Sequence, residues 1–167
     1  MNTQKNLILN AVQIEQKVRR IAYQIYEENS EEKEIIIAGI AENGYIFAEK
    51  IGKSLSEISA INIRMCKVSI DKKNVHSSVT TSLASNEYQN KSLVLIDDVL
   101  NSGSTLMYSI KHFLDVPIKR FKTAVLVNRN HKNFPVKADF KGISLATTLQ
   151  EHVVVDFLNA QPSAYLI

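Results

Sequence analysis

The chain has 167 residues, of which 45% are hydrophobic, and this is enough apolar material for one ordinary domain with its own core. Its 20 basic and 17 acidic residues nearly balance, so the net charge of +3 does not require a polyanionic partner. The only cysteine, Cys66, excludes an intramolecular disulfide and a cysteine-rich metal site, and we expect it to be a small buried side chain.

The bulk sequence also predicts a location and a domain count. No apolar run approaches the roughly 20 residues needed to cross a bilayer, and Met1 to Asn6 has no apolar signal core. A lone cysteine fits a reducing compartment. We therefore expect a cytoplasmic protein with no membrane partner, in which residues 1–167 form a single domain.

The first half of the chain alternates between helix and strand patterns. Apolar residues recur at three- and four-residue steps from Val12 to Tyr26, which predicts an amphipathic helix. The branched run Ile35 to Ile40 predicts a strand, and an Asn-Gly turn signal opens a helical pattern from Asn43 to Leu55. A second strand is expected over Ile61 to Ile70, followed by a long mobile polar loop from Asp71 to Asn90.

The second half continues the alternation and then weakens. Leu93 to Ile96 predicts a strand, Leu106 to Leu114 a helix that ends before Pro117, and Phe121 to Val127 another strand. Unbroken apolar strands that alternate with helices indicate a doubly wound, mostly parallel α/β sheet. A small β-rich hood is expected from three later stretches: Val136 to Phe140, Ile143 to Ala146 and Val153 to Phe157.

The strongest candidate site follows the strand at Leu93. The strand delivers two adjacent carboxylates, Asp97 and Asp98, to its carboxyl end, where open α/β sheets bind ligands. A loop of small residues then opens a helix, whose first N–H groups and dipole favour a phosphate. Glycine permits close approach and hydroxyls add donors. The loop residues are Asn101, Ser102, Gly103, Ser104 and Thr105.

Each of these residues also has a simpler interpretation. Ser102 could only cap the helix, Gly103 could only make a turn, and the two aspartates could be solvated carboxylates at a strand end. The segment lacks the Gly-Lys-Ser/Thr of a P-loop and the Gly-x-Gly-x-x-Gly of a dinucleotide site. The combination of paired acids with a phosphate cradle nevertheless favours a ligand site.

The run from Leu93 to Thr105 resembles the 5-phosphoribosyl-1-pyrophosphate (PRPP) signature of type I phosphoribosyltransferases. Arg19 to Ala22, Ala38 to Gly44, and Ala124 to His131 with the Pro135 and Ala138 to Phe140 that follow look like the pyrimidine-operon attenuation regulator and uracil phosphoribosyltransferase family. The resemblance implies the type I phosphoribosyltransferase fold. It also implies Mg²⁺-dependent transfer of phosphoribosyl from PRPP to a nucleobase, uracil being favoured, with release of pyrophosphate.

The resemblance also implies a role for each candidate residue. Asp97 and Asp98 would hold the ribose hydroxyls and meet Mg²⁺ only through water, while Asn101 to Thr105 would bind the 5-phosphate. Asp71 to Asn90 would be the flap that closes over the reaction. The pyrophosphate loop would be Ala41, Glu42, Asn43 and Gly44, and the base or pyrophosphate side would be Arg129 and His131.

The sequence departs from the family at three places. The family's pyrophosphate loop usually reads Thr-Arg-Gly, whereas this chain has Glu42, Asn43 and Gly44. A cation is thus replaced by an anion, and Glu42 would repel the ligand unless it turns away or meets the metal. Asn101 and Ser104 stand where Tyr and Arg are usual. Lys72 and Lys73 of the flap either supply the missing charge or only keep a loop soluble.

Two further functions stay open at this point. A regulator that binds PRPP or a nucleotide without turnover is consistent with the altered loop. RNA binding would use Lys17, Arg19 and Arg20 on one helix face, but an ordinary solvated face is favoured because the net charge is only +3. Family members commonly form homo-oligomers, so a dimer is expected.

Overall fold

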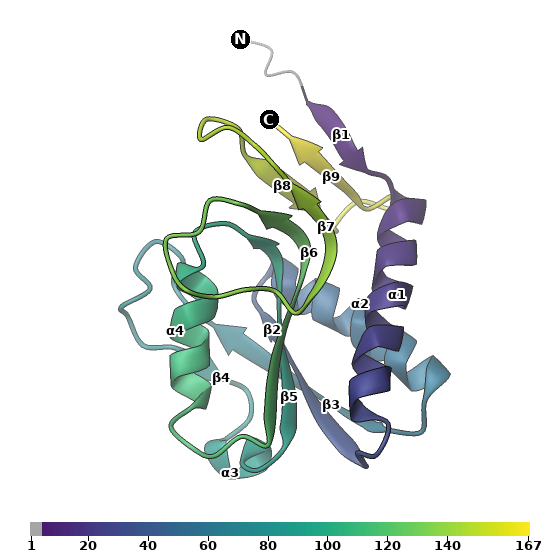
Figure 1. Cartoon of the computed structure of the whole chain (residues 1–167), viewed down its shortest axis with the longest axis vertical. Helices are drawn as coiled ribbons and strands as arrows, with labels where there is room; N and C mark the ends of the chain where they lie inside the picture. Colours follow the sequence, from purple (N-terminus) through teal and green to yellow (C-terminus); the bar gives the residue numbers. More distant parts are fainter. Residues whose placement is uncertain (1–4) are drawn as a thin grey trace.

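The computed structural model describes residues 5–167, which form two β-sheets and four helices (Figure 1). The larger sheet consists of β2 (Glu34–Ile40), β3 (Asn62–Ser69), β4 (Thr80–Thr81), β5 (Ser92–Leu100), β6 (Arg120–Arg129) and β7 (Phe140–Leu145). Its strand order is β4-β3-β2-β5-β6-β7, and every strand except the edge strand β4 runs parallel to its neighbours. The smaller sheet is the hood, formed by β1 (Asn6–Leu9), β9 (Ser163–Leu166) and β8 (Val153–Asp156).

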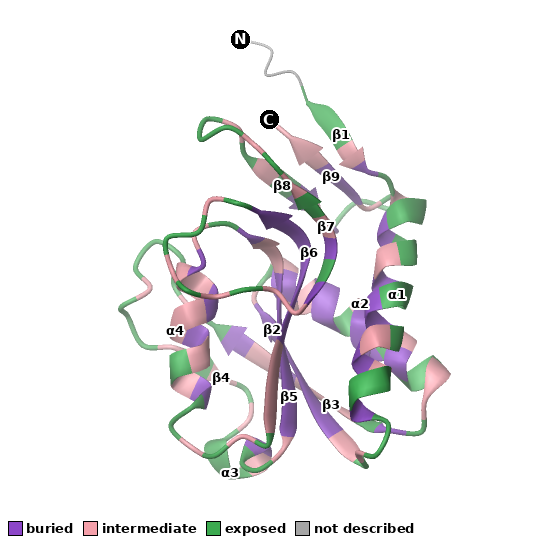
Figure 2. Cartoon of the chain, viewed as in Figure 1, coloured by how far each residue is buried: buried purple, intermediate pink, exposed green. Residues whose placement is uncertain are grey.

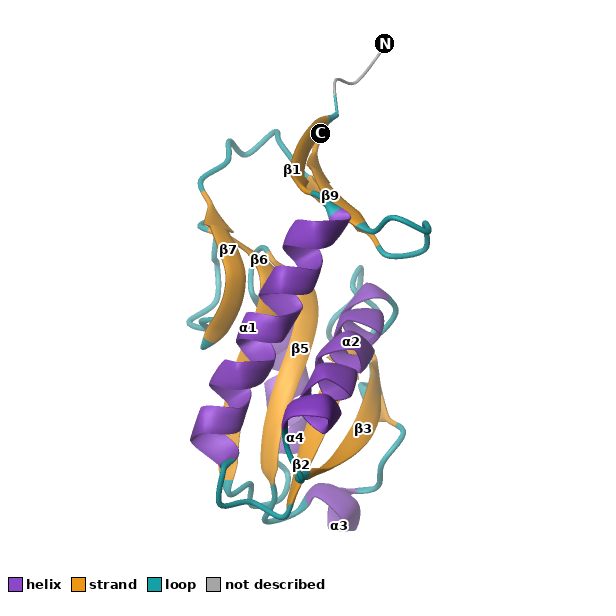
Figure 3. Cartoon of the chain, turned by 90° about the vertical axis from the view of Figure 1, so that its right-hand side faces the viewer, coloured by secondary structure: helices purple, strands orange, loops and turns teal. Residues whose placement is uncertain are grey.

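Helices cover both faces of the larger sheet. Figure 3 shows α1 (Ala11–Asn29) and α2 (Asn43–Ile58) together on one face, and α4 (Ser104–Phe113) lies behind the sheet. The short α3 (Ser85–Tyr88) lies at the end away from the hood. Each face therefore has its own apolar cluster, and the predicted doubly wound α/β class is confirmed.

Helix α1 forms as its sequence predicts. Asn10 caps it, because its side chain accepts from the Gln13 N–H at 2.9 Å while the Gln13 side chain accepts from the Asn10 N–H at 2.9 Å. Ile14, Val18 and Ile21 make a buried stripe, and in Figure 2 the buried side of the helix faces the sheet.

The strands at the centre of the sheet are buried on both faces. Ile35 to Ile37 and Leu93 to Ile96 have no exposed surface, which is why these strands read as continuous apolar runs (Figure 2). Cys66 is also fully buried, as predicted, and burial raises the pKa of its thiol. Between residues 5 and 167, no helix combines the length and apolar character that crossing a bilayer requires.

The prediction for the hood is wrong in part. Ile143 to Ala146 was expected there, but β7 pairs in parallel with β6 and extends the main sheet. Val136 to Phe140 is mostly a connection into β7. Only Val153 to Phe157 supplies a hood strand, and its partners β9 and β1 were not predicted, because four-residue strands are too short for a clear alternation.

The prediction of one long loop from Asp71 to Asn90 is wrong for its second half. β4 pairs antiparallel with β3, and α3 follows it. Tyr88 is buried and lies edge-on to Phe113 of α4, with ring centroids 4.9 Å apart. Such long-range contacts order a polar segment in a way that local periodicity does not reveal. We keep the name flap for residues 71–79, which have no helix or strand.

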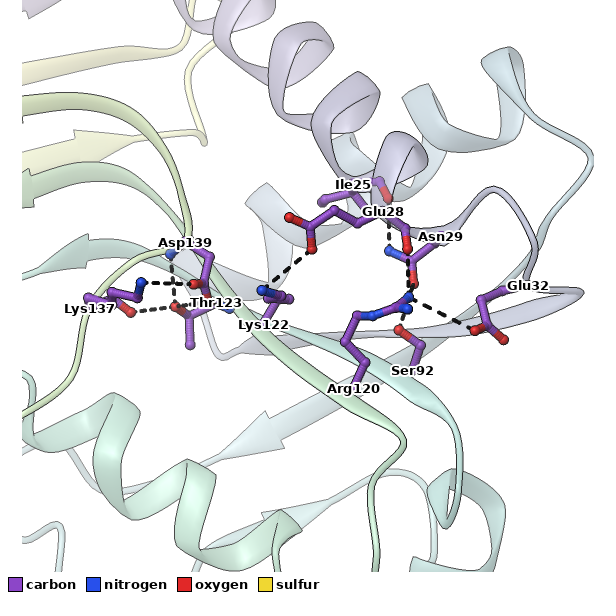
Figure 4. A network of polar contacts seen from close by, with 10 residues as sticks. All are labelled: Ile25, Glu28, Asn29, Glu32, Ser92, Arg120, Lys122, Thr123, Lys137 and Asp139. Carbon is purple, nitrogen blue, oxygen red and sulfur yellow. Dashed lines mark hydrogen bonds and ion pairs between the residues drawn. The ribbon is translucent and has the colours of Figure 1, made fainter.

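A polar network joins the end of α1 to the amino ends of β5 and β6 (Figure 4). The Asn29 side chain donates to the Ile25 carbonyl at 2.8 Å and accepts from the Ser92 hydroxyl at 2.6 Å. Arg120 donates to the Glu28 carbonyl at 2.6 Å and pairs with Glu32 at 3.9 Å. The network fixes the end of the sheet opposite the hood.

Candidate functional site

A cleft of about 340 Å³ lies at the carboxyl ends of β5 and β6, beside the hood. Asp97 to Leu106 line it without a break, so the predicted acids and phosphate loop share one cavity. Arg129 of β6 and Lys72 of the flap complete the lining on the sheet side, and His152 and Val153 line it from the hood. The site therefore draws on both sheets.

The two acids differ in burial although they are adjacent. The Asp97 side chain is 3% exposed and that of Asp98 is 13% exposed. The Asp97 carboxylate accepts from the Asp98 N–H at 2.9 Å, and Asp98 accepts from the Val99 N–H at 2.9 Å. Burial and the neighbouring charge of Asp98 raise the pKa of Asp97 to about 7, against the opposing effect of Lys72.

Lys72 reaches into the cleft from the flap. Its Nζ lies 3.2 Å from Asp97 Oδ1 and 3.9 Å from Asp98 Oδ1. Burial lowers the pKa of Lys72, but the two carboxylates together outweigh this and raise it. Lys73, by contrast, is exposed and only its backbone N–H bonds to Asp71. Of the two flap lysines, Lys72 is thus the one placed beside the acids.

The loop from Ala41 to Gly44 packs directly against the acids. Asn43 Nδ2 donates to Asp98 Oδ2 at 3.2 Å and to the Val155 carbonyl of the hood at 2.9 Å. A Cβ on Gly44 would lie 2.8 Å from Asp97 Oδ1 and 2.9 Å from Asp97 Cα, so only glycine fits. The Ala41 N–H donates to the Val68 carbonyl at 2.8 Å, which ties the loop to β3.

Glu42 turns away from the acids. Its side chain is 80% exposed and its carboxylate pairs with Lys67 of β3 at 3.6 Å. Glu42 does not line the cleft. Glu42 thus turns away from the site, which is one of the two arrangements in which it would not repel an anionic ligand; the other is contact with the metal.

One position of the phosphate loop, residue 103, requires glycine. Gly103 has φ of 89°, and a Cβ there would lie 2.6 Å from Val136 Cγ1. Gly103, not Ser102, is the residue that precedes α4, and it makes no side-chain cap. Ser102 Oγ instead lies 3.0 Å from Ser104 Oγ and accepts weakly from the Ser104 N–H at 3.3 Å. Two hydroxyls therefore meet where α4 begins.

Arg129 is 3% exposed and holds the walls of the cleft together. Its guanidinium donates to Asn101 Oδ1 at 3.1 Å and to Thr147 Oγ1 at 2.9 Å. It also donates to the carbonyls of Thr148 and Glu151, at 3.2 and 2.6 Å. The side chain thereby links the phosphate loop to the segment that leads into the hood.

The comparison with known proteins agrees with this geometry. The family model for the phosphoribosyl transferase domain matches residues 5–158. The chain belongs to the phosphoribosyltransferase family. It is 30% identical over 158 residues to the bifunctional protein PyrR of Macrococcus caseolyticus, covering 90% of this chain and 91% of that one. It is 29% identical over 154 residues to bifunctional protein PyrR of Streptococcus pneumoniae, covering 89% and 88%.

Solved structures confirm the phosphoribosyltransferase fold. A hypoxanthine-guanine phosphoribosyltransferase of Bacillus anthracis superposes with a TM-score of 0.70 at 19% identity, covering 84% of this chain and 82% of that one. The hypoxanthine phosphoribosyltransferase of Trypanosoma cruzi in complex with IMP gives 0.76 at 14% identity, covering 90% and 83%. The type I family and its fold, both predicted from the Leu93 to Thr105 motif, are thus confirmed.

The donors of this phosphoribosyltransferase suit a magnesium ion that arrives with its ligand. Among residues 5–167, no group of three or more His, Cys, Asp or Glu side chains is placed to hold a metal ion. Asp97 and Asp98 are hard oxygen donors, and Mg²⁺ typically keeps several waters and binds one or two carboxylates plus phosphates. The residues at the site therefore fit such an ion.

Two histidines of this phosphoribosyltransferase lie in unexpected places. His131 is hydrogen-bonded to the Thr147 carbonyl and does not line the cleft. His152, to which sequence reasoning gave no role, does line it. His152 pairs through its backbone with Ile167, so only the pairing of the last segments of the chain brings it to the cleft. No local pattern around His152 carries that information.

Proposed function

We propose that this chain transfers the phosphoribosyl group of PRPP to a nucleobase, uracil being the favoured acceptor, and releases pyrophosphate. The observation that carries the proposal is the joint placement of Asp97 and Asp98 with the start of α4 in one cleft. One part accepts hydrogen bonds and the other donates them. A sugar that carries both hydroxyls and a phosphate matches this pair of surfaces.

Each end of the ligand has a physical reason for its place. The 2- and 3-hydroxyls of ribose would donate to the carboxylates of Asp97 and Asp98, since charged acceptors make the stronger hydrogen bonds. The 5-phosphate would accept from the N–H groups and hydroxyls of Asn101 to Thr105, at the positive end of the α4 dipole. The pyrophosphate would then face Ala41 to Gly44, beside Asp98.

The reaction would break the bond between the anomeric carbon and pyrophosphate and form one to a base nitrogen, and the proton on that nitrogen would pass to the pyrophosphate or to solvent. Magnesium, when bound with PRPP, would neutralise charge on the leaving pyrophosphate. The chain's own residues would position the sugar and exclude water from its cation-like transition state. The flap contributes Lys72 to the lining of the cleft, and the hood side contributes His152 and Val153.

On the base side we keep Arg129 and His131 as candidates, in a modified role. Arg129 has four protein acceptors and His131 bonds to Thr147, so both would shape the wall beside the base. Asn128, next to Arg129 at the end of β6, has a buried side-chain oxygen, Oδ1, with no hydrogen-bond partner in the described structure.

A regulator that binds PRPP without turnover is the second candidate. The loop Glu42-Asn43-Gly44 in place of the family's usual Thr-Arg-Gly favours it, and the relatives that this chain resembles are named bifunctional. RNA binding is less supported, because Arg20 donates to the carbonyls of Lys141 and Gly142 at 3.0 and 2.7 Å. That contact holds α1 to β7 and removes one cation from the basic face.

We further propose that the chain works as one domain and as a homodimer. Both sheets contribute to the larger apolar cluster, which supports a single unit. The dimer rests on the family resemblance. Light scattering during gel filtration tests it, and a monomeric mass at micromolar concentration would remove the dimer from the proposal.

The test of the function is pyrophosphate release from PRPP and Mg²⁺. Uracil, hypoxanthine, guanine, adenine, xanthine and orotate are supplied separately, and calorimetry measures PRPP binding without a base. Turnover with uracil is expected. Binding of PRPP with no turnover on any base would favour the regulator, and absence of binding would reject both functions.

A further inference from the structure

The pyrophosphate loop offers no cation to the cleft. Where the resembled family usually has Thr-Arg-Gly, this chain has Glu42, Asn43 and Gly44, and Glu42 pairs outward with Lys67. PRPP carries most of its negative charge on the diphosphate, so a site without a nearby cation would bind it weakly. Magnesium bound with PRPP would neutralise part of the diphosphate charge, and a cationic side chain from another part of the chain would neutralise more.

Only two Lys or Arg side chains line the described cleft, Lys72 and Arg129. Arg129 is almost fully buried, and its donors are taken by Asn101, Thr147, Thr148 and Glu151. Moving it would leave those acceptors unpaired and separate the phosphate loop from the segment before the hood. Arg129 is therefore committed to structure.

Lys72 is in the opposite situation. Its side chain is 44% exposed, and its ammonium contacts only the two carboxylates that the ribose hydroxyls would use. A lysine head on a flexible four-carbon stem changes partner at small cost. Lys72 and the ribose thus compete for one pair of acceptors.

Few hydrogen bonds attach the flap that carries Lys72, although Val79 at its end packs against an apolar cluster of the main sheet. Its backbone bonds are local, Asn74 to Asp71 at 3.1 Å and Ser77 to Asn74 at 3.0 Å. Beyond Lys72, one side-chain bond ties it to α4, between His76 Nδ1 and the Tyr108 hydroxyl at 3.0 Å. The segment can shift by the small distance that a change of ion partner requires.

We propose that Lys72 is the diphosphate-binding residue of this site, which exchanges Asp97 and Asp98 for the diphosphate when PRPP binds. The inference rests on the proposed function, since it takes PRPP as the ligand. The hydroxyls replace the ammonium on the carboxylates, and the ammonium moves to the phosphate oxygens. Lys72 then performs the task that Arg performs from the pyrophosphate loop in the family.

Two ligands separate this role from a merely structural one. PRPP carries the diphosphate, whereas ribose 5-phosphate has the same hydroxyls and 5-phosphate without it. If Lys72 serves the diphosphate, Lys72→Gln weakens PRPP binding by about tenfold or more, as expected for a lost ionic hydrogen bond. The same variant binds ribose 5-phosphate as well as the unaltered chain or better, because a competitor for the carboxylates is gone.

The experiment is calorimetric titration of PRPP with Mg²⁺, and of ribose 5-phosphate, into four proteins. They are the unaltered chain, Lys72→Gln, Lys72→Arg and the matched control Lys73→Gln, whose side chain lies on the same flap but outside the cleft. Thermal melts confirm that each variant is folded. Lys72→Arg is expected to keep PRPP affinity within about threefold, since the charge remains.

The outcomes are distinct. Loss of PRPP affinity in Lys72→Gln alone, with ribose 5-phosphate unaffected or tighter, supports the inference. Equal weakening of both ligands, or PRPP affinity unchanged in Lys72→Gln, overturns it while leaving the proposed function in place. If the unaltered chain binds neither ligand, the proposed function fails and the inference fails with it.

Discussion

The two ends of the parallel sheet differ in how their charged side chains are paired. At the amino ends of β5 and β6, Arg120 meets the Glu28 carbonyl and Glu32, and Asn29 has a partner for both its oxygen and its nitrogen (Figure 4). At the carboxyl ends two acids stand side by side and share one lysine from a loosely held flap. Complementary pairing serves stability, whereas crowded like charges at a cleft indicate a site prepared for a ligand.

The largest expected effect comes from a substitution at the carboxyl end of β5, and it is a loss of PRPP affinity. Asp98→Asn removes a charged acceptor for a ribose hydroxyl and the partner of Asn43, so we expect PRPP affinity to fall about a hundredfold. Calorimetry checks this, with a thermal melt to show that the variant is folded. Unchanged affinity would remove Asp98 from the site.

A substitution at the amino ends of the strands should lower stability and leave PRPP binding unchanged. Asn29→Ala leaves the Ser92 hydroxyl and the Ile25 carbonyl without their buried partner, which should lower the free energy of unfolding by about 2 kcal/mol. PRPP affinity should not change. Urea unfolding measures the first quantity and calorimetry the second. A large loss of PRPP affinity would show that the two ends are not independent.

Stability should also depend on pH through Asp97. Burial and the charge of Asp98 raise its pKa from the ordinary 3.8 to about 7. Between these values the folded chain holds the proton that the unfolded chain has lost, so this contribution to stability falls as pH rises from about 4 through 7. The variant Asp97→Asn lacks this pH-dependent contribution. The melting temperature of the variant minus that of the unaltered chain should therefore increase from pH 5 to pH 8. A constant difference would contradict the raised pKa.

The smallest effect is expected at Glu42. Because its side chain is 80% exposed and points toward Lys67, Glu42→Arg should improve PRPP affinity by less than about threefold. Glu57→Arg on the outer surface of α2 makes the same charge change away from the cleft and serves as the control. A gain of tenfold or more at Glu42 alone would mean that residue 42 does face the diphosphate.

The sequence predicted the features that depend on local order. The stripe on α1, the apolar run of β5 and the loop from Asn101 to Thr105 each carry their signal within one segment, so their fold was foreseeable. The arrangement of Lys72 and His152 was not. The position of Lys72 depends on the path of the flap, and that of His152 depends on the pairing of β8 with β9. The spacing of residues along the sequence indicates neither.

The hood adds a constraint on the order of folding. Its strand β1 pairs with β9, and Asn6 lies opposite Leu166, so almost the whole chain separates the two partners. The local and mid-range pairings of the central sheet can form while the chain emerges from the ribosome, but this pairing waits for the last strand. The wall that carries His152 is therefore assembled last, and a nascent chain has its phosphate loop before it has a closed cleft.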